Sequence, residues 1–99
     1  MIELTSAKRP DGPREDLFSL DGTVYTIETE PKPSTGLRFL VECKTIGEAK
    51  AVVNLFEAVI GLDGLTALSQ AETMTPEQYQ SLQEIIIGHA LGSAALGKG

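Results

Sequence analysis

Two short apolar segments, separated by Asp21-Gly22, are the first clear pattern in the chain. Asp-Gly accepts the positive φ angles of a type I′ turn, whose twist suits paired antiparallel strands. A two-residue loop at this dipeptide places Phe18 opposite Tyr25. The pattern therefore predicts a β-hairpin over residues 17–28, with one apolar face that helices must cover.

After Glu30-Pro31-Lys32-Pro33, apolar residues recur every three or four positions, which is the period of an amphipathic helix. Ser34 is expected to cap this first helix. Its apolar stripe is expected to consist of Leu37, Leu40 and Val41. Gly47 then interrupts the pattern.

Helical periodicity resumes over residues 48–60, and Gly61 is expected to end that helix as its C-terminal cap. A short helix over 63–70 follows. The clearest helix start is Thr75-Pro76-Glu77-Gln78, which combines a hydroxyl cap, a proline at the first helical position and a glutamine three residues after the cap. The stripe behind it consists of Tyr79, Leu82, Ile86 and Ala90.

The predicted fold is a small α+β domain, mainly α, with three to four helices packed on an N-terminal β-hairpin. Residues 1–16 are rich in proline, glycine and charge near their end and are expected to form a flexible arm. The single domain is expected to cover residues 17–96, and residues 97–99 are expected to fray.

Composition narrows the function more than the fold. The chain has 99 residues, enough for one modest core, and its 41% hydrophobic content includes no tryptophan. The formal net charge of −6 disfavours binding to nucleic acid and to anionic lipid. We find no apolar run of membrane-spanning length and no basic-then-apolar signal at the N-terminus, and therefore expect no membrane association.

The residues that could carry chemistry are few. Cys43 and His89 are the only cysteine and histidine, so we expect no disulfide, no metal site and no cofactor. The helical neighbours of His89 offer no carboxylate to orient it, and no catalytic residue is assigned. Glu28 and Glu30 are interpreted as a solvated strand edge. Residues 92–98 match seven positions of a phosphate-binding loop, but Gly99 stands where a hydroxyl is required.

Three aliphatic residues of the last helix are candidates for binding another protein or another copy of the chain. The helix is apolar over a wider sector than a surface helix needs, and these residues flank its stripe. They are Ile85, Ile87 and Leu91. The alternative is that a small domain buries both sides of this helix.

The order of several segments resembles the tail assembly chaperones of long-tailed bacteriophages, especially those of actinobacteria. The resemblance covers roughly residues 17–99. It begins with Phe18-Ser19-Leu20-Asp21-Gly22-Thr23-Val24-Tyr25-Thr26-Ile27 and the proline-bearing link over residues 30–33. Leu37-Arg38-Phe39-Leu40, then Asn54-Leu55-Phe56-Glu57-Ala58-Val59-Ile60-Gly61, the segment 65–68 and the Thr-Pro-Glu-Gln helix start follow.

The resemblance implies a non-enzymatic protein of the host cytoplasm that is not retained in the mature virion. Such proteins bind the tape measure protein and promote polymerisation of the tail tube around it, so the major tail protein and self-association are further expected contacts. Members are often made in two lengths by a programmed frameshift. Codons for Leu96-Gly97-Lys98 can contain the slippery heptamer G-GGA-AAG, which fits a short, non-frameshifted form.

Two other interpretations stay open from the sequence. One is a structural virion component, such as a tail-completion or head–tail connector protein. The other is a host-encoded regulatory or antitoxin-like binding module. Peptides of this chain in purified particles would favour the first, and the genomic neighbourhood would separate the second from a chaperone gene.

Overall fold

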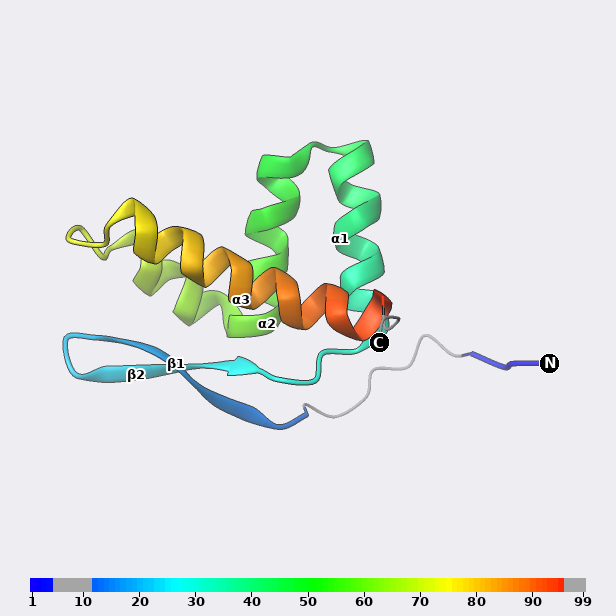
Figure 1. The fold of residues 1–99 in the computed structure, drawn as a ribbon, viewed down its shortest axis with the longest axis horizontal. Coiled ribbons are helices and arrows are strands. Elements are labelled where there is room, and N and C mark those ends of the chain that lie inside the picture. Colours follow the sequence, from blue (N-terminus) through cyan, green and yellow to red (C-terminus); the bar gives the residue numbers. More distant parts are fainter. Residues whose placement is uncertain (5–11, 96–99) are drawn as a thin grey trace.

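A computed structural model describes residues 1–4 and 12–95 of the chain. Two strands are followed by three helices, which confirms the predicted α+β class (Figure 1). The expected fraying over residues 97–99 and residues 5–11 of the expected arm lie outside the described residues. The elements are β1 (Arg14–Leu20), β2 (Thr23–Glu28), α1 (Pro33–Thr45), α2 (Glu48–Ser69) and α3 (Pro76–Ala95).

The hairpin has the predicted turn and register. Asp21 and Gly22 have φ angles of 50° and 84°, as a type I′ turn requires, and Phe18 pairs with Tyr25. Strand β1 begins at Arg14 rather than at Leu17. The Arg14 guanidinium explains the longer pairing, because Nε donates to Thr26 Oγ1 (2.8 Å) and Nη2 to the Thr26 carbonyl oxygen (2.9 Å).

A β-bulge at Leu17 was not predicted. Asp16 pairs with Thr26 and Phe18 pairs with Tyr25, so Leu17 is the extra residue of β1. A bulge breaks the strict alternation of a strand and turns neighbouring side chains to the same side. Both Leu17 and Phe18 accordingly pack against the core.

The first helix differs from the prediction in two ways. Pro33 occupies the first helical position, so the cap is Lys32 and the expected cap at Ser34 is wrong. The buried residues of α1 are Gly36 and Phe39, because α1 packs against both α2 and α3 through this side. The expected apolar stripe therefore lies on the exposed side of α1.

Two glycines set the course of α2. Gly47 precedes the helix with a φ of 101°, and Gly61 interrupts it with φ 86° and ψ 161°. Both residues occupy a region of backbone space that is open almost only to glycine. The predicted helices over 48–60 and 63–70 are the two halves of α2, which change direction at Gly61 (Figure 1).

The start of α3 is the capping box that the sequence predicts. The amide of Gln78 donates to Thr75 Oγ1 (3.1 Å), and the amide of Thr75 donates to Gln78 Oε1 (2.9 Å). These two bonds satisfy amides that have no partner within the helix. They fix both the first turn of α3 and the side chain of Gln78.

The core is aliphatic apart from two phenylalanines, as expected from a chain with five aromatic residues. It joins the hairpin to all three helices. The largest fully buried side chains are Ile27 of β2, Val59 of α2 and Ile86 of α3. Strand β2 contacts α2 through Ile27, and Leu17 and Phe18 of β1 also pack against the core.

Helix α2 also corrects the expectation that no apolar run is long enough to span a membrane. It has 22 residues, and its most apolar window has a mean hydropathy of 1.6. In the folded chain 44% of that window is buried, and Gly61 breaks the helix. A helix that supplies the core of a small domain has the same composition.

Candidate functional site

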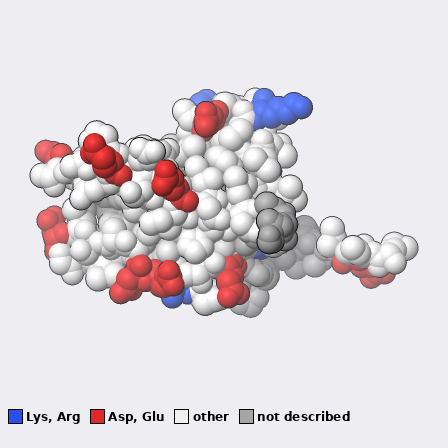
Figure 2. Space-filling view, in the orientation of Figure 1, with Lys and Arg blue, Asp and Glu red and all other residues white. Residues whose placement is uncertain are grey.

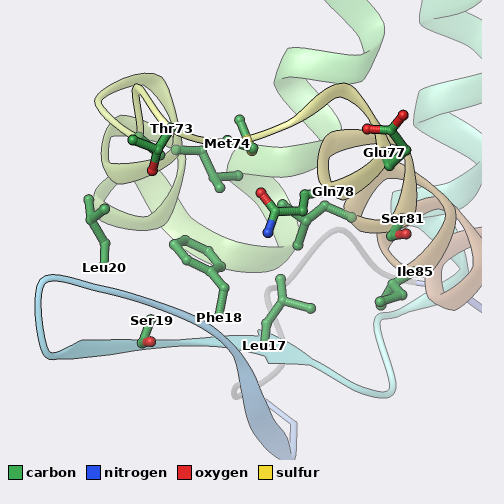
Figure 3. A pocket seen from close by; sticks show the side chains of 13 residues that line it. Leu17, Phe18, Ser19, Leu20, Thr73, Met74, Glu77, Gln78, Ser81 and Ile85 are labelled. Carbon is green, nitrogen blue, oxygen red and sulfur yellow. The ribbon is translucent and has the colours of Figure 1, made fainter.

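An apolar groove of about 540 Å³ lies between β1 and the N-terminal half of α3 (Figure 3). The end of α2 and the link to α3 close it on the inner side. Its apolar lining consists of Leu17, Phe18, Leu20, Leu68, Ala71, Met74, Leu82 and Ile85. Its polar lining consists of Ser19, Thr73, Glu77, Gln78 and Ser81. We call this feature the groove.

The strand side of the groove depends on the bulge. Leu17, Phe18 and Leu20 project from β1 toward the helices (Figure 3). A regular strand would turn Leu17 and Phe18 to opposite faces. The ring of Phe18 also stacks on that of Tyr25, with centroids 5.0 Å apart, so the hairpin holds this wall of the groove in place.

The helix side of the groove follows from the spacing of residues along α3. Glu77, Ser81 and Ile85 recur every four residues and therefore lie on one face. Leu82 contacts the core beside them, whereas Ile85 remains 43% exposed. An exposed isoleucine at the edge of an apolar groove is available to a partner.

The structure separates the three partner-binding candidates. Ile85 lines the groove, but Ile87 and Leu91 are half-buried and pack against the core. The broad apolar sector of α3 thus packs partly against the core and lies partly exposed at the groove. The other groove residues were not among the predicted partner-binding residues. The sequence signal that could have indicated the bulge is the adjacent apolar pair Leu17-Phe18.

A second apolar surface was also missed, on α1. Leu37, Leu40 and Val41 are 57%, 48% and 58% exposed. These three residues form what we call the α1 stripe. Lys44 continues the same helix face, since it lies seven, four and three residues beyond them.

A smaller, polar hollow of about 330 Å³ lies between α1 and α2. Arg38 and Glu57 are among its lining residues, and Asn54 Nδ2 donates to Glu42 Oε1 across it (3.2 Å). Neither His89 nor Cys43 lines it. Its side chains therefore offer hydrogen bonds and charge, without a nucleophile beside a base.

The remaining candidates for chemistry lie on different elements. His89 and Cys43 are half-buried, on α3 and α1. Glu28 Oε2 accepts a hydrogen bond from the amide of Gly12 (3.3 Å). Residues 92–95, the first part of the segment that resembles a phosphate-binding loop, belong to α3. The rest of that segment lies outside the described residues. Within residues 1–4 and 12–95, no three His, Cys, Asp or Glu side chains are grouped to hold a metal ion.

Basic side chains cluster mainly at one end of the molecule, whereas acidic side chains are spread more widely (Figure 2). Lys and Arg gather where α1 meets the start of α2, but an acidic side chain lies beside them, and Asp and Glu also cover α3 and the hairpin. Among the described residues that line the groove, Glu77 is the one that carries a charge. Comparison of the chain with protein-family models, curated proteins and solved structures finds no match.

Proposed function

We propose that the protein is a non-enzymatic tail assembly chaperone of a long-tailed bacteriophage. It binds a helical segment of the tape measure protein in the groove and promotes polymerisation of the tail tube. The observation that supports this proposal is the groove itself, in which aliphatic side chains from a strand and a helix remain open to a partner. The resemblance of residues 17–99 to such chaperones supplies the client.

The groove suits an amphipathic helix better than a small substrate. Helix-in-groove recognition buries apolar residues at positions i, i+3, i+4 and i+7 of the bound helix between two apolar walls. Leu17 and Phe18 form one wall, and Leu82 and Ile85 form the other. The polar lining residues lie among these walls without the nucleophile, base and orienting group of an enzyme.

The charge of the chain serves the same function. An assembly chaperone carries apolar binding surface, and like charges on its exterior limit nonspecific aggregation. A net charge of −6 supplies this repulsion. The protein acts in the host cytoplasm and leaves the assembled tail.

Co-purification tests the proposal. The full chain is co-expressed with overlapping fragments of the tape measure protein encoded in the same genome, and one fragment is expected to co-purify. Ile85→Asp should abolish that capture, because it places a charge in the groove. Val53→Asp is the matched control, since Val53 is 49% exposed on α2 and does not line the groove.

Two results would contradict the proposal. One is that no fragment co-purifies with a folded wild-type chain. The other is equal loss of capture by both variants, which would separate binding from the groove. Circular dichroism of each purified chain establishes that it is folded before either result is interpreted.

A further inference from the structure

The α1 stripe has the pattern of a helix that docks into a groove. Leu37, Leu40 and Val41 occupy positions i, i+3 and i+4, and Lys44 occupies i+7. All four residues are exposed, although α1 packs its other side against α2 and α3. Three adjacent, half-exposed aliphatic side chains form a patch of the kind that marks an interaction site.

The stripe and the groove match in length. With a rise of 1.5 Å per residue, the stripe from Leu37 to Lys44 extends about 10 Å along α1. The wall of the groove from Glu77 to Ile85 extends about 12 Å along α3. One surface projects from the molecule and the other is recessed, so a helix face of this length can pack along that wall.

The two surfaces also match in charge. Lys44 is the charged residue on the face of the stripe, and Glu77 is the charged residue that lines the groove. Glu42, the acidic residue of α1, points to the polar hollow, where it accepts a hydrogen bond from Asn54. A lysine that meets a glutamate across an apolar contact favours one orientation of the two surfaces.

We infer that the α1 stripe of one copy docks into the groove of a second copy of this chain. The hairpin turn and the start of α3, which flank the groove, lie at one end of the molecule, and α1 lies toward the other (Figure 1), so a chain cannot fill its own groove. The contact joins two different surfaces and is therefore head-to-tail. A pair of copies leaves one stripe and one groove free, so further copies can add at both ends until a ring closes.

This self-association needs no tape measure protein and goes beyond the proposed function. Because it uses the same groove, a client helix and the α1 stripe exclude one another. A second copy therefore covers the groove until a client of higher affinity displaces it, which hides the apolar lining from unrelated proteins.

Mixing two single-site variants tests the contact. Val41→Asp disables the stripe and keeps the groove, whereas Ile85→Asp disables the groove and keeps the stripe. Wild-type chain is expected to grow in mass with concentration in sedimentation velocity, over about 10 µM to 1 mM because a one-helix contact is weak. Each variant alone should stay monomeric, and their equimolar mixture should form a dimer that grows no further.

Other outcomes would overturn the inference. A wild type that stays monomeric over the whole range does so, as does a mixture that stays monomeric while both variants are folded. Loss of association in Val41→Asp alone, with Ile85→Asp unaffected, would indicate a symmetric contact between two α1 stripes. Leu37→Asp and Ser81→Arg are second variants of the stripe and the groove, and they apply if a first variant fails to fold.

A pair of lysine variants isolates the charge contact. Lys44→Glu and Lys50→Glu change the net charge by the same amount, but Lys50 belongs to α2 and is not part of the helix face that carries the stripe. Lys44→Glu should raise the dissociation constant at least about fivefold more than Lys50→Glu does. Equal effects would show that overall charge, rather than the stripe, controls association, and would overturn the orientation inferred above.

Discussion

The guanidinium of Arg14 donates a hydrogen bond of 3.2 Å to the backbone carbonyl oxygen of Val59. This oxygen belongs to the last turn of α2 before the break at Gly61, where carbonyl groups lose regular helical partners. The same nitrogen, Nη2, donates to the Thr26 carbonyl oxygen of β2. Arg14 thus connects both strands of the hairpin to the point at which α2 changes direction.

Removal of this guanidinium should weaken the whole domain. We expect Arg14→Gln to lower the free energy of unfolding by about 1 kcal/mol, because one side chain loses three hydrogen bonds at a partly exposed site. Arg38→Gln removes the same charge from an exposed position on α1 and should change it by less than about 0.5 kcal/mol. Urea denaturation of both variants measures the difference, and equal values would contradict the role given to Arg14.

The parts of the fold that the sequence predicts well are those set by neighbouring residues. The type I′ turn at Asp21-Gly22 and the capping box of Thr75 and Gln78 each depend on groups within a few residues of one another. The break at Gly61 follows from one glycine. Each of these features is determined before any tertiary contact forms, so local reasoning suffices.

The glycines of α2 and α3 should respond to alanine in opposite directions. Gly61→Ala is expected to cost about 1–3 kcal/mol of stability, because φ 86° with ψ 161° suits only glycine. Gly88 is helical and exposed, and a Cβ there meets no atom within 4 Å. Gly88→Ala should therefore raise stability by about 0.5–1 kcal/mol.

Thermal unfolding of the two alanine variants gives the comparison. A stabilising Gly61→Ala would mean that α2 can run straight through the break. A destabilising Gly88→Ala would mean that the exposed side of α3 is in contact with something that a methyl group displaces.

The capping box should contribute measurably to the stability of α3. We expect Thr75→Ala to cost about 1 kcal/mol, because the amide of Gln78 loses the Oγ1 acceptor and Gln78 loses its reciprocal partner geometry. Thr73→Ala is the control, since Thr73 is also an exposed threonine of the same link and lies outside the box. Hydrogen exchange at the first turn of α3 should quicken in the first variant alone.

Aspartate substitutions at two neighbouring isoleucines of α3 should differ in their effect on the stability of the domain. Ile85→Asp should leave the domain folded, because this side chain is 43% exposed at the groove. Ile87→Asp should cost about 2 kcal/mol or more, because it places a charge against the core. Leu91→Asp should resemble Ile87→Asp; denaturation midpoints that rank Ile85→Asp lowest would contradict these placements.

The exposed side of α1 shows why the rest of the site could not be predicted from the sequence. Gly36, Phe39 and Cys43 recur with the same helical period as Leu37, Leu40 and Val41, so periodicity alone does not choose between the two sides. The choice is made by α2 and α3, against which α1 buries Gly36 and the ring of Phe39. The bulge at Leu17 is likewise fixed by what the strand packs against.

The bulge at Leu17 has a second consequence, for the outer edge of the hairpin. Among the described residues β1 pairs with β2 alone, so its other edge presents backbone groups that an extended chain could bind. A bulge twists such an edge, and the exposed carboxylates of Glu15 and Asp16 beside it repel a second acidic hairpin. The irregularity that places Leu17 in the groove therefore also protects concentrated protein against edge-to-edge aggregation.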